Sequence, residues 1–90
     1  MGWRIEFERA AARELNDLDQ TAVSRILTFL RERLARLDDP RAIGEPLKGA
    51  RLGSLWKYRV GDWRIIADIQ DERVVVLVVR IGHRREVYRR

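Results

Sequence analysis

The sequence predicts a single small α+β domain, in which a mostly antiparallel sheet carries two helices packed on one of its faces. Three observations lead to this fold class: an alternating segment near the N-terminus, two segments of helical character after it, and three β-rich segments in the second half. A chain of 90 residues, 46% of them hydrophobic, has room for one core. We therefore expect one domain over residues 1–90, in the order strand, helix, helix and three-stranded meander.

The N-terminal half accounts for the first strand and both helices. Residues 3–8 alternate between apolar and charged side chains, which is typical of a half-buried strand. Residues 9–18 are rich in alanine and other helix formers and predict a short helix. Asp19 is a suitable N-cap for a second helix over 20–37, where apolar residues recur at three- and four-residue steps. Two aspartates and Pro40 then end that helix.

The C-terminal half predicts the three-stranded meander, with strands at about 55–60, 63–70 and 73–81. Gly61 stands at the first central position of the first turn, which favours a type II′ hairpin. The last strand contains the run from Val74 to Val79, which is apolar on both faces. We therefore expect this strand to be central or covered on both sides.

The first hairpin of the meander gathers basic residues on one face. A two-residue turn places Arg59 opposite Arg64, and the alternation of strand side chains adds Lys57 to the same face. The opposite face receives the expected core residues Trp56, Tyr58, Val60, Trp63 and Ile65. Because opposed arginines repel each other, the cluster is most easily retained where an anion binds. The hairpin therefore predicts a phosphate site.

The charge distribution points to the same half of the chain. The net charge is +5, and residues 1–45 hold 8 Lys and Arg against 9 Asp and Glu, whereas residues 46–90 hold 11 against 5. An excess of positive charge on one part of a small domain favours contact with a polyanion such as a nucleic acid. Candidate contacts for a nucleic-acid backbone are Lys48, Arg51, Arg85 and Arg89.

Several other classes of site find no support in the composition. The chain has no cysteine and one histidine, which excludes disulfides and leaves no tetrahedral metal site, so we expect neither metal nor cofactor. No phosphate-binding glycine motif of the nucleotide-binding folds occurs. The longest apolar run is too short to span a membrane, and the N-terminus has no signal-peptide pattern. We expect a cytoplasmic protein without membrane contact.

Over essentially its whole length, the chain resembles the RelE family of toxins from type II toxin–antitoxin systems, within the wider RelE/ParE superfamily. Besides the order of elements, the resemblance rests on the segments Pro46-Leu47-Lys48-Gly49, Trp56-Lys57-Tyr58-Arg59-Val60-Gly61-Asp62-Trp63-Arg64-Ile65 and Gly82-His83-Arg84-Arg85-Glu86-Val87-Tyr88. It implies an endoribonuclease that cuts messenger RNA on the ribosome without a metal, by attack of a 2′-hydroxyl on the adjacent phosphate. It also implies a RelB-type antitoxin as partner, and operator DNA bound only through the toxin–antitoxin complex.

The resemblance carries catalytic roles over to Lys57, Arg59, Arg64, Arg84 and Tyr88, by matched motif. The best-known members have lysine where this chain has Arg59, and arginine is a poor proton acceptor. Lys57 is therefore the better candidate for the base, since neighbouring arginines favour its neutral form. The alternatives are that Lys57 and Arg59 only anchor a phosphate, that Arg64 pairs with a carboxylate, and that Tyr88 packs on the sheet edge.

His83 is a secondary candidate on chemical grounds alone, because histidine is the side chain best suited to move a proton near neutral pH. Its alternative is a plain surface residue beside arginines. Two other functions stay open for the whole chain: a ParE-like toxin that poisons DNA gyrase without cutting RNA, and an inactive member kept as an antitoxin-binding co-repressor.

Overall fold

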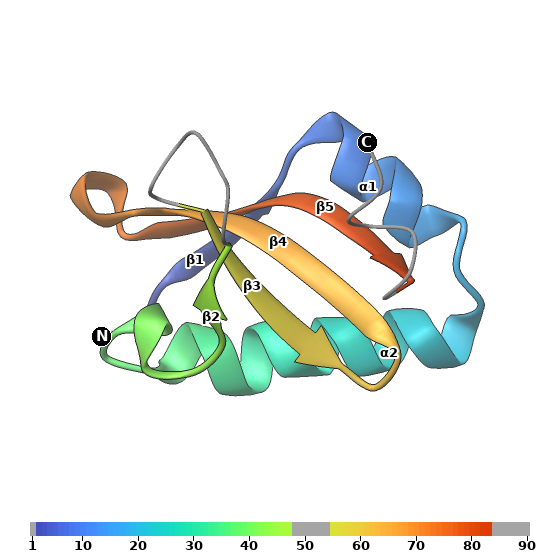
Figure 1. The fold of residues 1–90 in the computed structure, drawn as a ribbon, viewed down its shortest axis with the longest axis horizontal. Helices are drawn as coiled ribbons and strands as arrows, with labels where there is room; N and C mark the ends of the chain where they lie inside the picture. Colours follow the sequence, from blue (N-terminus) through green and yellow to red (C-terminus); the bar gives the residue numbers. More distant parts are fainter. Residues whose placement is uncertain (1, 48–54, 84–90) are drawn as a thin grey trace.

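The computed structural model describes residues 2–47 and 55–83. Its helices and strands are β1 (Arg4–Phe7), α1 (Arg9–Asn16), α2 (Gln20–Thr28), β2 (Glu45–Pro46), β3 (Leu55–Val60), β4 (Trp63–Gln70) and β5 (Val75–His83). Figure 1 shows them in sequence colours. The predicted order of strand, two helices and meander is confirmed. Among the described residues, no helix is long and apolar enough to cross a membrane.

The five strands form one mixed sheet in the order β1-β5-β4-β3-β2. β1 runs parallel to β5, and the other three pairs are antiparallel, so the expected mostly antiparallel sheet is confirmed. β2 is an addition to the prediction: Glu45 pairs with Lys57, and Pro46 pairs with Trp56. Two residues are too few for a periodic signal, and proline is tolerated here because β2 is an edge strand.

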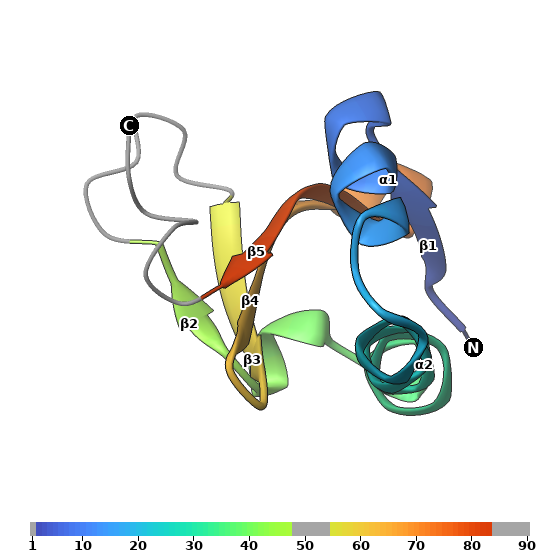
Figure 2. The same cartoon turned by 90° about the vertical axis from the view of Figure 1, so that its right-hand side faces the viewer.

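Both helices pack on one face of the sheet, as predicted, and Figure 2 shows α1 and α2 on the same side of β3, β4 and β5. One continuous cluster of buried residues joins them to the strands: Ala11, Leu15, Ile26, Leu30, Leu34, Tyr58, Ile65, Ala67, Val76, Val78 and Ile81. Trp56, Val60 and Trp63 are half-buried against this cluster. The expected core face of the hairpin is therefore confirmed.

The helices differ from the prediction at their ends. α1 ends at Asn16. Asp19 caps α2 through a 2.8 Å hydrogen bond that its Oδ1 accepts from the backbone N–H of Ala22. The predicted helix over 20–37 is α-helical only to Thr28 and then continues as a π turn at Phe29–Arg33 and a 3₁₀ turn at Leu34–Arg36. The apolar spacing predicts the helical path but does not distinguish these tighter and wider turns.

The last strand begins at Val75, two residues later than predicted, because Asp71–Arg73 form a 3₁₀ turn and Val74 takes a left-handed conformation (φ 54°). β5 lies between β1 and β4, which confirms its central position. Its register against β4 shifts between Ile66 and Ala67.

The part of β5 that follows its pairing with β1, which ends at Val78, is held by α1. The carboxylate of Glu14 accepts a 2.7 Å hydrogen bond from the backbone N–H of Ile81 and a 2.9 Å hydrogen bond from Nε of Arg80. Glu14 therefore fixes the C-terminal part of β5 beyond the strand's pairing with β1.

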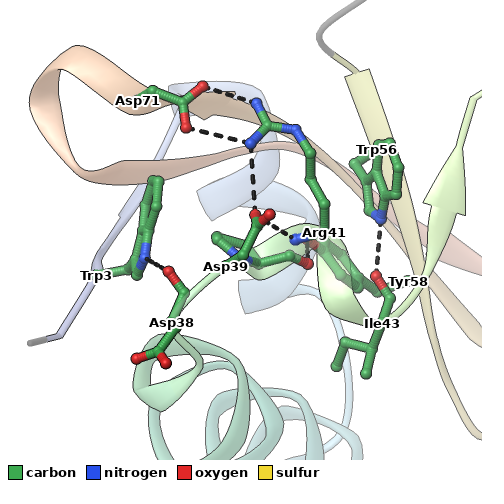
Figure 3. Close-up of polar contacts among 9 residues, drawn as sticks. Trp3, Asp38, Asp39, Arg41, Ile43, Trp56, Tyr58 and Asp71 are labelled. Atoms are coloured by element: carbon green, nitrogen blue, oxygen red, sulfur yellow. Dashed lines mark hydrogen bonds and ion pairs between the residues drawn. The ribbon is translucent and has the colours of Figure 1, made fainter.

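The segment from Asp38 to Ile43 joins the helical layer to β2 and is anchored by three aromatic side chains (Figure 3). The hydrogen bonds run from Trp3 Nε1 to the Asp38 carbonyl (3.1 Å), from the Tyr58 hydroxyl to the Pro40 carbonyl (2.7 Å) and from Trp56 Nε1 to the Ile43 carbonyl (2.8 Å). We call residues 38–43 the anchored segment. Because these bonds originate from Trp3, directly before β1, and from β3, they tie both strands to the start of β2.

An ion pair adds a fourth anchor (Figure 3). The guanidinium of Arg41 makes a two-pronged contact with the carboxylate of Asp71, with Nη1–Oδ1 at 3.1 Å and Nη2–Oδ2 at 2.8 Å. Arg41 also contacts Asp39, whose Oδ1 accepts the Arg41 backbone N–H at 3.0 Å. The hydrogen bond from Arg41, aided by its charge, lowers the pKa of Asp71. The pair connects the anchored segment to the turn between β4 and β5.

Candidate functional site

The β3–β4 hairpin has the predicted register. Arg59 stands opposite Arg64, and Lys57 opposite Ile66. Gly61 has φ 59° at the first position of the turn, as the predicted type II′ geometry requires. Since paired residues share a face, Lys57, Arg59 and Arg64 lie together on the face that does not carry the helices. The central geometric prediction from the sequence is therefore confirmed.

The charges of this cluster are only weakly balanced. Lys57 lies 3.8 Å from the carboxylate of Glu45, and its side chain is 26% exposed. Arg64 donates from Nη1 to the carbonyls of Gly61 and Trp63, both at 3.3 Å, and these carbonyls carry no net charge. Within residues 2–47 and 55–83, neither Arg59 nor Arg64 forms an ion pair. Two guanidinium groups thus remain available to an anion.

A hollow of about 460 Å³ opens at this cluster, beside the part of β3 that β2 leaves unpaired. Its walls are formed by Phe29, Arg33, Ile43, Gly44, Glu45, Lys57, Tyr58, Arg59 and Arg64. We call it the basic pocket. Four of these residues are basic and one is acidic, so the hollow attracts a negatively charged group.

Tyr58 closes the floor of the basic pocket from the core side. Its side chain is buried and packs against Phe29 with ring centroids 5.8 Å apart. Burial raises the pKa of Tyr58, so the hydroxyl keeps its proton and remains the donor to the Pro40 carbonyl. The residue is therefore a fixed part of the wall.

Glu45 is a member of the pocket that the sequence did not identify. The backbone turns into β2 at Gly44, where φ is 76° and an added Cβ would lie 2.5 Å from the carbonyl oxygen of Lys57. Only glycine fits this turn. The turn brings Glu45 level with Lys57 across the strand pair, on the basic face. The sequence does show a glycine before an acidic residue, which is typical of a turn. It does not show that Glu45 lies beside Lys57, because the pairing of β2 with β3 is a contact between distant segments.

Arg33 is the second member that sequence reasoning missed. It lies at the end of the π turn and enters the pocket from the helical layer. In regular α-helical geometry it would follow Ile26 by two turns and fall near the buried stripe. The π turn changes that angle, and Arg33 is exposed.

The other predicted site residues lie elsewhere or outside the described part of the chain. His83 stands opposite Trp63, with ring centroids 5.8 Å apart at 85°, so the structure places it on the helix side and not with the basic cluster. The remaining candidates lie outside the described residues: Lys48, Arg51, Arg84, Arg85, Tyr88 and Arg89.

The chemistry available in the basic pocket is that of cations and one carboxylate. Guanidinium groups bind phosphate oxygens in a two-pronged manner, an ammonium provides a compact charge, and a carboxylate accepts a proton. Within residues 2–47 and 55–83, no group of three or more His, Asp or Glu residues gathers as a metal site. The pocket therefore suits a phosphodiester group and a proton acceptor beside it.

Comparison with known proteins agrees with this fold. The family model for the ParE toxin of the type II toxin–antitoxin system parDE matches residues 5–88. The chain is 30% identical to Toxin RelG of Mycobacterium tuberculosis over 90 residues, which is 100% of both chains.

Solved structures give the same picture. The toxin–antitoxin complex RelBE2 from Mycobacterium tuberculosis contains a chain with a TM-score of 0.81 and 26% identity, over 92% of each chain. The intact Escherichia coli RelBE complex contains one with a TM-score of 0.73 and 25% identity, over 90% of this chain and 95% of that one.

Proposed function

Because this chain belongs to the RelE/ParE superfamily of type II toxin–antitoxin toxins, we propose that it is a ribosome-dependent endoribonuclease that cuts messenger RNA without a metal ion. The observation that carries this proposal is the basic pocket. Three of its cations, Lys57, Arg59 and Arg64, stand on one face of the hairpin, and the two arginines among them form no ion pair within the described residues. A toxin that only docked on a protein would not need an open pocket for a phosphate.

The proposed reaction is transfer of the phosphodiester within the RNA itself. The 2′-oxygen of one nucleotide forms a bond to the adjacent phosphorus, and the bond from phosphorus to the 5′-oxygen of the next nucleotide breaks. The proton of the 2′-hydroxyl goes to a base, and the leaving 5′-oxygen takes up a proton. The products are a 2′,3′-cyclic phosphate and a 5′-hydroxyl, so no water and no oxidant is consumed.

Arg59 and Arg64 have the stabilising role in this reaction. Negative charge grows on the non-bridging phosphate oxygens in the transition state, and two fixed guanidinium groups on one face can bind those oxygens more strongly as the charge develops. Arg64 is held by the carbonyls of Gly61 and Trp63, which restricts its position before the substrate binds.

Glu45 is the better proton acceptor of the pocket, and Lys57 acts as its cationic partner. Lys57, which the sequence favours as base, lies 3.8 Å from the Glu45 carboxylate, and a charged ammonium has no lone pair with which to take a proton. The carboxylate has such lone pairs, and it stands at the pocket wall with its side chain 63% exposed. Lys57 then stabilises the phosphate or protonates the leaving oxygen.

The remaining predicted residues complete the proposal. Arg84 adds charge near the leaving group, and Tyr88 stacks on a base. His83 serves as proton donor only if the end of β5 turns toward the pocket when RNA binds. Lys48, Arg51, Arg85 and Arg89 contact backbone phosphates of the messenger or the ribosome.

A RelB-type antitoxin is the proposed protein partner, since the similar solved structures named above are complexes of RelE toxins with their antitoxins. We propose that operator DNA is bound only through such a complex, and that the toxin acts in the cytoplasm, where ribosomes translate. A short reading frame beside the gene for this chain is the expected source of the antitoxin.

Primer extension on a translated message tests the nuclease. We expect wild-type protein to produce codon-phased cuts with 5′-hydroxyl ends, and Arg64→Ala to lose them. Arg4→Ala, which removes an exposed arginine from the far edge strand, is the matched control and should cut like wild type. Glu45→Gln separates the roles: it should reduce the cutting rate by about 10²–10⁴, the usual contribution of general base catalysis.

A gyrase poison is the second candidate, because the family model that matches residues 5–88 describes the ParE toxin. The same samples decide between the two. Uncut messages together with inhibited DNA supercoiling by purified gyrase would replace the nuclease with this function. Intact messages and unaffected gyrase would leave an inactive, antitoxin-binding co-repressor.

A further inference from the structure

We propose that Arg33 is a further RNA-binding residue, which holds a backbone phosphate next to the one that is cut. This inference rests on the proposed function and extends the substrate path beyond the basic pocket. It assigns a substrate contact to the helical layer, whereas the residues proposed above come from the strands and the segments between and after them.

The position of Arg33 between two hollows is the first observation. Besides the basic pocket, a hollow of about 770 Å³ lies between α2 and the β3–β4 turn. It is lined by Gln20, Thr21, Ser24, Arg25, Thr28, Phe29, Glu32, Arg33, Val60 and Gly61. Phe29 and Arg33 are the residues that line both hollows. A chain that leaves the basic pocket toward this second hollow therefore passes Arg33.

The lining of the second hollow suits a sugar–phosphate backbone. Its helical wall presents hydroxyl and amide groups from Gln20, Thr21, Ser24 and Thr28, together with the guanidinium of Arg25. Such side chains donate hydrogen bonds to phosphate oxygens and ribose hydroxyls without reading the base. The two hollows thus share a boundary at Phe29 and Arg33, and the cation of Arg33 stands at that boundary.

The charge of Arg33 is uncompensated. Its neighbour Glu32 is engaged by Arg36 at 2.8 Å, and Glu45, the one acidic residue of the basic pocket, lies beside Lys57. Arg33 itself forms no ion pair within the described residues. A guanidinium in this state binds an incoming phosphate without first breaking a salt bridge.

The backbone supports a functional role at the same place. Arg33 ends a π turn with φ −116° and ψ −60°, outside regular helical values. Without this turn, the arginine would point toward the buried stripe that contains Ile26 and Leu30, where an unpaired charge is costly. π turns are rare and occur often at functional sites. Here the turn delivers one arginine to the junction of the two hollows.

The test measures binding of an uncleavable RNA at several salt concentrations. The probe is a short single-stranded RNA with 2′-O-methyl riboses, which lacks the attacking hydroxyl, and the readout is fluorescence anisotropy. The slope of the logarithm of the binding constant against the logarithm of salt reports the number of neutralised phosphates, at about 0.7 per phosphate for single strands. We expect Arg33→Ala to reduce this slope by about 0.7 and Arg33→Lys to retain it.

Arg31→Ala is the matched control, because Arg31 lies in the same π turn, is exposed and lines neither hollow. It should keep the wild-type slope. If Arg33→Ala behaves like Arg31→Ala while Arg64→Ala weakens binding, the inference about Arg33 is wrong and the proposed nuclease stands.

Two further outcomes overturn the inference in other ways. No salt-dependent binding by wild-type protein would overturn the inference about Arg33, while primer extension on a translated message decides the nuclease separately. Loss of antitoxin affinity in Arg33→Ala, with an unchanged slope for RNA, would place Arg33 in a protein interface instead.

Discussion

Arg41, within the anchored segment, and the arginines of the basic pocket differ in what balances their charge. Arg41 is paired with Asp71 and Asp39, and the neighbouring carbonyls accept hydrogen bonds from aromatic side chains. In the basic pocket, Arg59 and Arg33 are exposed beside other cations and lack a carboxylate partner among the described residues. Paired charge holds the fold together here, and unpaired charge marks the place for a ligand.

The largest expected effect is a loss of cutting rate, and it distinguishes the arginines of the basic pocket from Arg41. We expect Arg59→Ala to reduce the cutting rate by about 10²–10³, as loss of one preorganised donor to a transition state does. Its free energy of unfolding should change by less than about 0.5 kcal/mol, because the side chain is exposed. Arg41→Ala should lower the free energy of unfolding and leave the cutting rate per folded molecule unchanged. Equal loss of stability in both variants would contradict the distinction.

Tyr58→Phe should weaken the anchored segment without touching a charge. The variant keeps the buried ring but leaves the Pro40 carbonyl without its 2.7 Å donor, which costs about 1–3 kcal/mol for a buried group. Urea unfolding measures the change, and an unaltered m-value would show that the folded and unfolded states keep their compactness. An unfolding free energy equal to that of the wild type would mean that water replaces the hydroxyl.

Asp71→Asn should change how stability depends on acid. The pKa of Asp71 is lowered in the folded protein, so the folded state holds this proton less readily than the unfolded state does. The contribution of the carboxylate is complete above the ordinary range of aspartate, about pH 4, and is lost as the pH falls through the lowered value. Thermal unfolding should therefore differ between variant and wild type at neutral pH and converge in strong acid. A constant difference would contradict the assignment.

The smallest effect is expected for Arg36→Ala. Its 2.8 Å contact with Glu32 is a one-turn pair between exposed side chains, 72% and 61% accessible. Such pairs contribute about 0.3–0.5 kcal/mol. Urea unfolding should barely resolve the change, and a loss above 1 kcal/mol would show that pairing alone does not predict the structural importance of an arginine.

The sequence predicts the hairpin well because local chemistry determines it. Gly61 fixes the turn, the turn fixes the register, and alternation then assigns Lys57, Arg59 and Arg64 to one face. The first helix follows from its helix-forming residues, the second from its apolar spacing, and the central place of β5 from a run that is apolar on both faces. These features depend on residues a few positions apart.

The missed members of the pocket depend on contacts between distant segments. Glu45 reaches Lys57 through a two-residue strand that has no periodicity of its own, and Arg33 reaches the pocket through a π turn that interrupts a helical pattern. The position of His83 also could not be predicted from local sequence. The register shift between β4 and β5 determines which face of the sheet carries it, and the motif around His83 contains no sign of that shift.

The short length of β2 also affects whether the free protein associates with further copies of itself. β2 pairs with Lys57 and Trp56, and the N–H of Leu47 donates to the Leu55 carbonyl. Among the described residues, the end of β3 from Tyr58 to Val60 has no strand partner on this side, and such an edge is a template for pairing with another chain. Two molecules joined along this edge would bring Arg59 of one near the cations of the other. Their repulsion opposes self-association and aggregation. The arginines proposed to bind a phosphate therefore also protect this edge of β3 from pairing with another copy.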